Sequence, residues 1–324
     1  RGYDMSGNPH AHQVTGNDSV AFIAGGEDGL IIVNVKDPSE PEVLKQIRTW
    51  SGWGGPNAYT VELKNNYLFV GVLSAGPDIY IMDIQNPSNP IEINNFEFSS
   101  VIDLSIYGDT LVVGSRNGPL SLYNISDPSN VSKIDSTDLR DYISSVILEN
   151  GLIYVSRVHG WVQGPKIDVL NSQSLEILKS FAFREISKIN IAGDNLLCAN
   201  KMNGYKVFNK IEGTLIDSIE TGGIIDDYEA SGDYHYLSFL EGSFSVYKEL
   251  FDNPQIVETV KTGYGGELLA QNKSSILQIY NSFGATLNLV DKSNPTTIIN
   301  MGKITSASKL VGFGNYFILT NYQS

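Results

Sequence analysis

Residues 29–41 read GLIIVNVKDPSEP, an apolar run that ends in a turn rich in Asp, Ser and Pro. Similar stretches return as IYIMDIQNPSNP at residues 79–90 and as LYNISDPSN at residues 122–130. Short apolar runs bounded by Pro, Asp, Asn and Gly indicate β-strands joined by tight turns, and no helical period competes with them here. Because the stretch recurs at a nearly constant spacing, we expect a repeat protein made of strands.

Four strand-like segments make up one repeat of about 40 residues. In the first copy they are His12–Thr15, Ser19–Ala24, Leu30–Val35 and Val43–Arg48. We place seven copies near residues 12–49, 59–98, 102–137, 144–183, 187–220, 226–262 and 266–304, and a partial eighth copy at residues 308–320. The later copies diverge more, but each keeps the turn between its first two strands.

A four-stranded antiparallel sheet cannot bury both of its faces alone, whereas several such sheets arranged radially cover one another. The sequence therefore predicts an all-β fold, a β-propeller of four-stranded antiparallel blades, in a single domain over residues 1–324. We prefer eight blades, with the last one built from Ser308–Thr320 and closed by Arg1–Gly7. Seven blades followed by a C-terminal hairpin are the alternative.

The third strand and the turn after it resemble the LVIVD repeat, whose signature is an apolar strand ending in Asp-Val, followed by Asp-Pro-Ser-Asn-Pro. Residues 29–41, 79–90 and 122–130 carry this resemblance. It weakens in the later copies, most clearly where Asn209–Gly213 replaces the turn. The resemblance implies a secreted or surface-attached bacterial or archaeal propeller without an assigned reaction, and it transfers no catalytic residue.

Composition and charge exclude several classes of partner. The chain of 324 residues has a net charge of −14 and no run of Lys or Arg, so it would repel nucleic acid and an anionic membrane surface. No apolar stretch reaches the roughly 18 residues needed to cross a bilayer. Because the chain begins at Arg1, a signal or lipid-anchor segment could have been removed. We expect an extracytoplasmic monomer, in the periplasm or on the outer cell surface.

In a propeller, the connections between first and second strands and between third and fourth strands share one face, here called the turn face. The remaining connections share the opposite face, here called the loop face, and in this chain they are longer and more individual. Exposed Trp and Arg are typical of recognition surfaces. We therefore predict ligand binding on the loop face by Trp50, Trp53, Arg116, Arg157, His159, Trp161 and Tyr264. The alternative is that Trp50 and Trp53 fill the space between neighbouring blades.

One polar residue per copy precedes the innermost apolar position and is predicted to line the central channel. These residues are Gln13, Thr60, Asp103, Ser145, Lys188, Asp227, Glu267 and Lys309. Since buried charges need partners, the two lysines and three carboxylates would form a hydrated, mutually compensating lining. The alternative is an ion or polar ligand at the channel mouth.

Metal and thiol chemistry have little support in the sequence. His10 and His12 have the spacing of metal ligands on an extended strand, but two His without a nearby Cys make a weak candidate site. We expect no cofactor, with a divalent cation as the alternative. The single Cys198 lies in an apolar run and is expected to fill the core. The Asp-Pro-Ser-Asn-Pro turns are expected to be structural, with Asp and Asn bonding their own backbone.

The expected function is a non-enzymatic binding or scaffold propeller that engages a protein or glycan of the cell envelope through its loop face. The sequence contains no nucleophile elbow, phosphate loop or His-Glu-x-x-His motif. The alternative is a hydrolase or lyase that uses carboxylates at the channel mouth, with or without a divalent metal. A purely structural spacer in an envelope assembly is the third interpretation.

Overall fold

The computed structural model of the chain describes its strands and the tighter turns. The described residues are 13–17, 19–26, 28–36, 42–48, 57–73, 78–98, 100–116, 119–140, 142–157, 166–182, 186–200, 204–220, 225–231, 234–239, 243–248, 255–261, 266–271, 275–281, 285–304, 309–313 and 316–320. Contacts between Cα atoms divide the chain into two compact units, residues 1–183 and residues 184–324, here called the first and the second unit.

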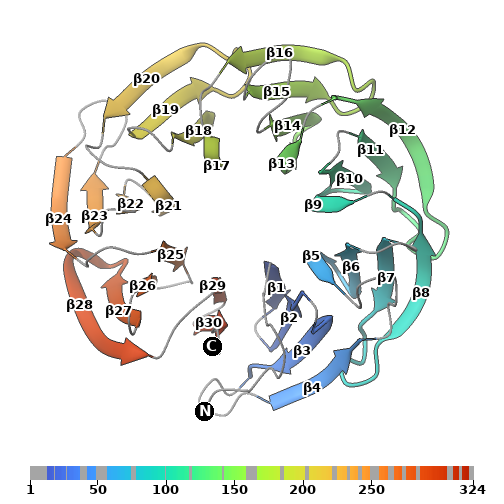
Figure 1. Ribbon diagram of the computed structural model, residues 1–324, viewed down its shortest axis with the longest axis horizontal. Coiled ribbons are helices and arrows are strands. Elements are labelled where there is room, and N and C mark those ends of the chain that lie inside the picture. The colour runs from blue at the N-terminus through green and yellow to red at the C-terminus, as the bar shows by residue number, and fades with distance from the viewer. Residues whose placement is uncertain are drawn as a thin grey trace. The chain divides into compact units, whose positions relative to one another are not determined.

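The first unit consists of four antiparallel sheets, each with its four strands paired in chain order (Figure 1). The first strands of these sheets lie on the inner side of the unit and the fourth strands on its outer side (Figure 1). The first sheet contains β1 (Gln13–Asn17), β2 (Val20–Ala24), β3 (Leu30–Asn34) and β4 (Glu42–Ile47); the second contains β5 (Ala58–Lys64), β6 (Tyr67–Val72), β7 (Ile79–Asp83) and β8 (Ile91–Phe96); the third contains β9 (Val101–Tyr107), β10 (Thr110–Ser115), β11 (Pro119–Asn124) and β12 (Ser132–Asp138); the fourth contains β13 (Ile143–Glu149), β14 (Leu152–Arg157), β15 (Lys166–Asn171) and β16 (Ile177–Ala182).

The second unit continues the same pattern with three four-stranded sheets and one two-stranded sheet. The fifth sheet contains β17 (Ile186–Ala192), β18 (Asn195–Asn200), β19 (Gly204–Asn209) and β20 (Leu215–Glu220); the sixth contains β21 (Ile225–Ser231), β22 (Tyr234–Phe239), β23 (Ser243–Lys248) and β24 (Gln255–Lys261); the seventh contains β25 (Gly266–Gln271), β26 (Ser275–Asn281), β27 (Ala285–Asp291) and β28 (Asn294–Ile304); the eighth contains β29 (Lys309–Phe313) and β30 (Tyr316–Thr320).

The hydrophobic core lies between neighbouring sheets. In the first unit, one apolar cluster joins the first and second sheets and includes Phe22 and Val70, both fully buried. A second cluster joins the second and third sheets, and a third joins the third and fourth sheets. In the second unit, Phe244 of the sixth sheet and Ile276 of the seventh share one cluster. Each sheet is therefore stabilised by the apolar side chains of its neighbour, because burying them removes apolar surface from water.

Close packing between sheets requires small residues on the second strand. A Cβ atom on Gly71 of β6 would lie 2.4 Å from Cγ2 of Thr60 and 2.6 Å from Cγ1 of Val101, which belongs to the next sheet. A Cβ atom on Gly114, the equivalent residue of β10, would lie 2.9 Å from Cγ1 of Val146 in the fourth sheet. Glycine at these two positions lets the first strand of the following sheet approach the backbone directly.

The end of the third strand has the same local structure in six of the four-stranded sheets. The last residue of the strand is Asp or Asn, and its side-chain Oδ1 accepts the backbone N–H two residues later at 2.7 to 3.1 Å. These residues are Asn34, Asp83, Asn124, Asn171, Asn209 and Asp291. The sixth sheet has Lys248 at this position. The side chain thus starts the turn by mimicking a backbone acceptor.

The Asp-Pro-Ser-Asn turn that follows uses the same device once more. Asp127 Oδ1 accepts the Ser129 N–H at 3.0 Å, and Asn86 Oδ1 accepts the Ser88 N–H at 3.2 Å. The prediction that these turns are structural and bond their own backbone is confirmed. The fully buried, unpaired thiol of Cys198 is likewise confirmed as part of the core.

The all-β prediction is confirmed, whereas two finer expectations stay predictions. Residues 1–7, which are expected to close the eighth blade, lie outside the described part of the chain. The expectation of a single domain over residues 1–324 also stays a prediction, because the division into two units does not test it. Among the described residues, no helix has the length and apolar character needed to span a membrane.

Candidate functional site

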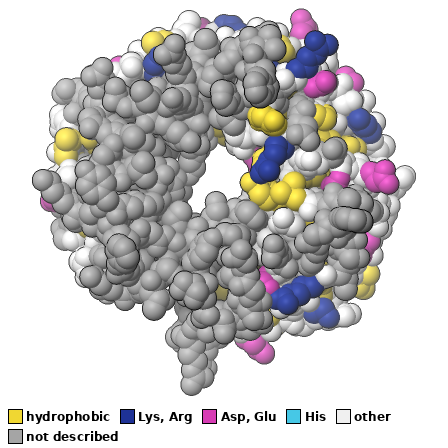
Figure 2. Space-filling view, in the orientation of Figure 1, with side chains coloured by type: hydrophobic (Ala, Val, Ile, Leu, Met, Phe, Trp, Pro, Cys, Tyr) yellow, Lys and Arg dark blue, Asp and Glu magenta, His cyan; other side chains and the backbone are white. Residues whose placement is uncertain are grey.

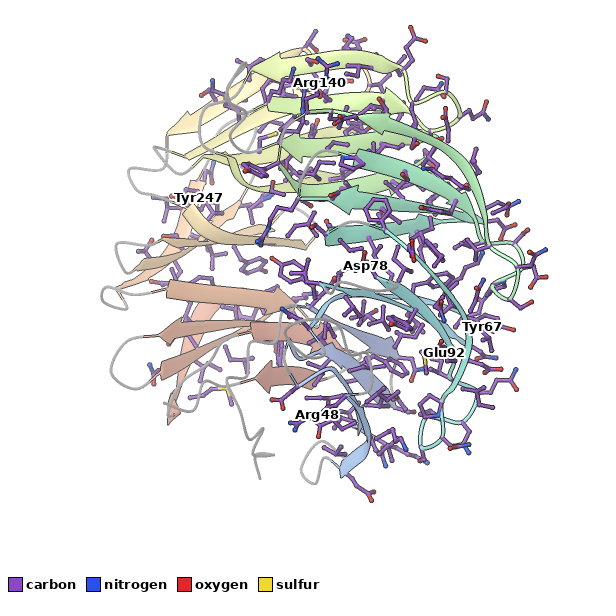
Figure 3. All side chains as sticks on the ribbon, turned by 45° about the vertical axis from the view of Figure 1, so that its right-hand side comes forward. Arg48, Tyr67, Asp78, Glu92, Arg140 and Tyr247 are labelled. Carbon is purple, nitrogen blue, oxygen red and sulfur yellow. The ribbon has the colours of Figure 1, made fainter. Side chains whose placement is uncertain are left out.

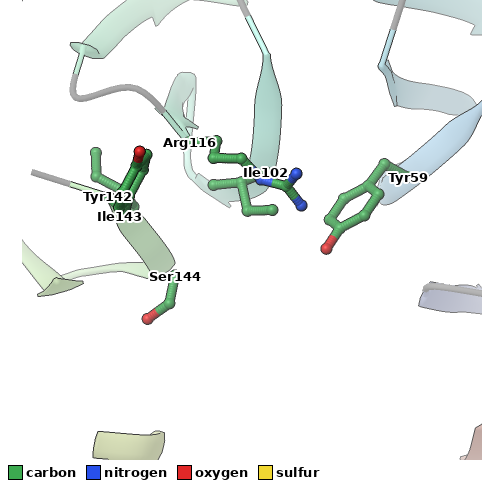
Figure 4. A pocket seen from close by; sticks show the side chains of 6 residues that line it. All are labelled: Tyr59, Ile102, Arg116, Tyr142, Ile143 and Ser144. Carbon is green, nitrogen blue, oxygen red and sulfur yellow. The ribbon is translucent and has the colours of Figure 1, made fainter. Parts of the chain in front are cut away.

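An open pocket lies on the loop face of the first unit. It has a volume of about 380 Å³ and is lined by Tyr59, Ile102, Arg116, Tyr142, Ile143 and Ser144 (Figure 4). Tyr59, Ile102 and Ser144 lie near the starts of the first strands of three consecutive sheets, and Arg116 directly follows β10. Three sheets therefore contribute to one site.

β-Bulges at the starts of the first strands shape this pocket. Ala58 pairs with Val72 and Thr60 with Gly71, so that Tyr59 is the extra residue in β5. The same shift leaves Ile102 as the extra residue in β9 and Ser144 in β13. A bulge re-aims a side chain out of the regular alternation of its strand. All three extra residues line the pocket, which is therefore a consequence of the repeated bulge.

The lining of the pocket is mostly apolar and aromatic. Ile143 is buried, whereas Tyr142 is 44% exposed. Arg116 is exposed, and Figure 4 shows its guanidinium group pointing toward Tyr59. The Arg116 backbone N–H donates to the Ser100 carbonyl at 2.9 Å, which holds the start of the loop. In the first unit, a Lys or Arg side chain also lies between hydrophobic side chains on the surface that faces the viewer in Figure 2.

At the edge of the pocket, Ser144 forms a hydrogen bond with Ser156. Its Oγ lies 2.5 Å from the Ser156 Oγ and can also donate to the Ser156 carbonyl at 3.3 Å. The Ser144 hydroxyl is thus held against β14. Among the described residues that line the pocket, Arg116 carries the one charged group, its guanidinium.

The structure corrects the prediction for Arg157. This residue was expected on the exposed loop, but its side chain is only 3% exposed and forms an ion pair with Asp168, which is fully buried. Arg157 Nη1 also donates to the Leu139 carbonyl at 2.7 Å, and Ser180 Oγ donates to Asp168 Oδ1. Arg157 is the last residue of β14, so it belongs to the strand and not to the loop on which the sequence places it.

A second ion pair occupies the corresponding end of the first sheet. Arg48, which follows β4 and is labelled in Figure 3, forms an ion pair with the buried carboxylate of Asp28. Gln46 Nε2 donates to the Asp28 carbonyl at 3.0 Å. The buried carboxylates of Asp28 and Asp168 are therefore each matched by an arginine of the same sheet, as a buried charge requires.

In the first unit, the residues predicted to line the channel form hydrogen bonds between neighbouring sheets, and their place at a channel stays a prediction. Gln13 Oε1 accepts hydrogen bonds from the Thr60 hydroxyl and from the Val61 N–H, the latter at 3.1 Å. Asp103 Oδ2 accepts hydrogen bonds from the Ser145 hydroxyl at 3.0 Å and from the Val146 N–H at 2.9 Å. The two arrangements are equivalent. In each of these two sheet pairs, one side-chain oxygen of a first strand accepts hydrogen bonds from the first strand of the next sheet.

Glu62 of β5 lies between these two junctions and was missed in the sequence. Gln13 Nε2 donates to its Oε1 at 3.4 Å. Burial raises the pKa of Glu62 to about 7, and the nearby carboxylate of Asp103 adds to the shift. Burial likewise raises the pKa of Asp103 to about 6, although three hydrogen bonds to the carboxylate oppose this shift. The inner strands of the first unit thus hold two carboxyl groups that titrate near neutral pH.

The other predicted site residues remain predictions. Trp50, Trp53, His159, Trp161, Tyr264, His10 and His12 lie outside the described residues. Lys188, Asp227, Glu267 and Lys309 lie on β17, β21, β25 and β29, and only the backbone of these four residues is described. Within the described ranges, no group of three or more His, Cys, Asp or Glu side chains is placed to hold a metal ion.

Most pocket residues could not be found from residue type alone. Of the lining residues, only Arg116 is predicted from the sequence. Tyr59, Ile102 and Ser144 are placed there at the starts of strands, and Tyr142 and Ile143 fall between two copies of the repeat. What distinguishes three of them is the β-bulge, an extra residue in each first strand relative to its partner strand. Without the pairing partners, this extra residue is indistinguishable from a longer strand.

The repeat motif itself is recognised by comparison with known families. Residues 12–49 and 55–97 match the model of the LVIVD repeat. Two segments of the first unit are thus similar to LVIVD repeats. The matched segments contain the stretches at residues 29–41 and 79–90 on which the resemblance was based, so that expectation is confirmed. No curated protein matches the chain.

Solved structures show the fold at low sequence identity. Sqt1 from Saccharomyces cerevisiae is 9% identical with a TM-score of 0.76, over 98% of this chain and 94% of that chain. The C-terminal WD40 domain of Sif2 is 12% identical with a TM-score of 0.75, over 97% and 93%. BamB from Moraxella catarrhalis is 10% identical with a TM-score of 0.69, over 95% and 90%. WD40 repeats form propellers, so the predicted β-propeller fold is confirmed.

Proposed function

We propose that the chain is a non-enzymatic binding propeller that engages a protein partner through the loop face of its first unit. The observation that supports this proposal is the open pocket of Tyr59, Ile102, Arg116 and Tyr142. Tyr and Arg are enriched at the centres of protein interfaces, since an aromatic ring contributes large contact area at low entropic cost. The LVIVD repeats and the propeller fold are consistent with such a role.

The turn face, in contrast, uses its polar side chains to join neighbouring sheets. Lys64 Nζ of the second sheet forms an ion pair with Asp109 of the third at 2.6 Å. The Tyr107 hydroxyl of the third sheet donates to Asn150 Oδ1 of the fourth at 2.6 Å. Side chains that hold the scaffold together in this way are poor candidates for partner recognition, which favours the loop face.

The alternative of a hydrolase or lyase has less support from the carboxylates. Asp103, its main candidate in the first unit, accepts the Leu104 N–H at 3.0 Å in addition to the bonds from Ser145 and Val146. A general base needs an oxygen within reach of the substrate. Both oxygens of Asp103 are engaged with the protein, so its role as an acceptor between sheets is the better-supported one.

The proposal includes an extracytoplasmic location, which rests on the resemblance to surface-attached LVIVD proteins. Trp50, Trp53, Trp161 and His159 stay part of the proposed binding face, since they fall on loops of this face in the sequence. Fractionation of cells that produce the full-length gene product tests the location. Recovery only in the cytoplasm would contradict it.

Selection of peptides from a phage-displayed library of random sequences tests the binding function. The wild-type protein should enrich peptides, and Tyr142→Ala in the pocket should lose this enrichment. Tyr107→Ala is the matched control. Tyr107 is 48% exposed and Tyr142 is 44% exposed, so the two changes remove a similar exposed side chain, and Tyr107 lies on the turn face. Enrichment that survives Tyr142→Ala and fails with Tyr107→Ala would overturn the choice of face.

A further inference from the structure

We infer that the pocket takes an extended segment of a protein partner in which an apolar side chain and a single acidic side chain lie two residues apart, with the carboxylate bound by Arg116. This inference rests on the proposed binding function and adds the chemical class of its ligand. It is carried by the described residues that line the pocket, which are two isoleucines, two tyrosines, one serine and one arginine.

The apolar part of the ligand follows from the floor and walls of the pocket. Ile143 is 2% exposed, and Ile102 is half-buried beside it on the neighbouring sheet. Tyr142 leaves 44% of its surface exposed above this floor. A ligand side chain that covered these groups would remove apolar surface from water, at about 25 cal/mol per Å². An aliphatic or aromatic side chain therefore fits this part of the site.

The acidic part follows from Arg116. Its guanidinium is exposed and makes no ion pair with any residue in the described part of the chain, unlike the guanidinium groups of Arg48 and Arg157. None of the described residues that line the pocket carries a carboxylate. Arginine binds a carboxylate through two parallel N–H donors, which makes it selective for that group.

The overall charge restricts the number of acidic groups in the ligand. A chain with a net charge of −14 repels a polyacidic segment over the Debye length. A ligand with one carboxylate is attracted to Arg116 at short range, and its repulsion by the net negative charge of the protein stays small. The segment is therefore expected to carry one acidic residue flanked by uncharged or basic ones.

The source of the carboxylate is an Asp or Glu side chain. A chain terminus is usually captured by several converging backbone N–H groups, whereas the Arg116 N–H already donates to Ser100. A sugar would need several acceptors for its hydroxyl groups, because each buried hydroxyl without a partner costs free energy. The side chains of the described lining residues offer only hydroxyl oxygens as acceptors.

The spacing follows from an extended ligand. Side chains two residues apart point to the same side of an extended segment and lie about 6.6 Å from each other along it. Three consecutive sheets line the pocket, which suits a segment that crosses their ends. The expected recognition pattern in the ligand is therefore an apolar residue, then any residue, then an acidic residue.

The test compares peptides selected from a phage-displayed library of random 12-residue sequences by four proteins: wild type, Arg116→Ala, Arg116→Glu and Lys133→Glu. Lys133 is exposed on β12, outside the pocket, and Lys133→Glu controls for the change in net charge. We expect wild type and Lys133→Glu to enrich the apolar-x-acidic pattern. Arg116→Glu should enrich apolar-x-basic sequences instead, a switch that a purely structural role of Arg116 would not produce.

Synthetic peptides then give the size of the effect. The two peptides contain Gly-Phe-Ser-Glu-Gly or Gly-Phe-Ser-Gln-Gly between the flanking residues of the best selected sequence. Both peptides are acetylated at the N-terminus and amidated at the C-terminus. Replacing Glu by Gln, or Arg116 by Ala, should each weaken binding about fivefold, as expected for an ion pair at an exposed rim. The two changes together should weaken it little more than either alone, since they remove the same contact.

The outcomes separate the two proposals. Enriched peptides without acidic residues that still depend on Tyr142 would overturn the carboxylate inference and leave the binding function intact. A preference for peptides with a free terminal carboxylate, in a library displayed with free C-termini, would also overturn it. No enrichment above the Tyr142→Ala background, or binding to a glycan array instead, would overturn both.

Discussion

The Oδ2 atom of Asp103 on β9 accepts the backbone N–H of Val146 on β13 at 2.9 Å, across the junction between two sheets. The corresponding junction between the first and second sheets uses Gln13 and Val61 at 3.1 Å. Both acceptors occupy the same position of the repeat. Polar residues on the inner strands of the first unit thus serve as fasteners between sheets.

Removing this acceptor should destabilise the first unit. Asp103→Ala leaves the Val146 N–H and the Ser145 hydroxyl without their acceptor, at an expected cost of about 1–3 kcal/mol in the free energy of unfolding. Asp103→Asn keeps a carbonyl acceptor and should cost less. Urea denaturation followed by circular dichroism measures both, with Glu97→Gln on the exposed surface as the control. Equal midpoints for Asp103→Ala and wild type would contradict the fastening role.

The raised pKa of Glu62 predicts a stability that increases as the pH falls from 8 to 5. Burial raises the pKa of Glu62 from 4.5 to about 7, so the folded state binds this proton more tightly than the unfolded state. The contribution to stability is complete below pH 4.5 and is lost as the pH rises through 7. The raised pKa of Asp103 acts in the same direction.

Glu62→Gln tests this pH dependence directly. The variant should be more stable than wild type at pH 8 and should show a flatter dependence of the urea midpoint on pH between 5 and 8. The exposed variant Glu97→Gln should follow the wild-type curve. A Glu62→Gln curve parallel to wild type across this range would show that Glu62 does not titrate there.

Gly71→Ala should weaken the packing of the second sheet against the third. The added Cβ would overlap Thr60 and Val101 at 2.4 and 2.6 Å, and overpacking of this kind costs about 1–3 kcal/mol. The melting temperature measured by calorimetry should fall, whereas Ser132→Ala, at an exposed position of β12, should leave it unchanged. A Gly71→Ala protein as stable as wild type would mean that the sheets can separate without cost.

Breaking the buried ion pair of Arg157 and Asp168 should have the largest effect. Arg157→Met removes the cation beside a fully buried carboxylate, with an expected loss of about 3–5 kcal/mol. The double change Arg157→Met and Asp168→Leu should recover much of this loss. Lys64→Met, which breaks an ion pair with the exposed Asp109, should cost less than about 1 kcal/mol. Similar urea midpoints for Arg157→Met and Lys64→Met would contradict a structural role of the buried pair.

Short-range chemistry was predictable from the sequence. The turn residues Asp127 and Asn86 bond backbone groups two positions away, and this geometry depends on local conformation alone. The apolar runs of the third strands mark the repeat for the same reason, and the repeat implies the propeller. The polar positions at Gln13 and Asp103 were found as a set, but their contacts with the next sheet were not.

The sequence by itself determined the repeat, its four strands and the turns that join them, because period-two apolar patterns and turn residues act within a few positions of the chain. Only the tertiary structure decided that Arg157 is buried, that Glu62 titrates near neutral pH, and that Tyr59, Ile102 and Ser144 meet in one pocket. These properties arise from pairing registers and from contacts between residues about 40 positions apart in neighbouring repeats. A bulge has no residue signature of its own, since it exists only relative to the strand beside it.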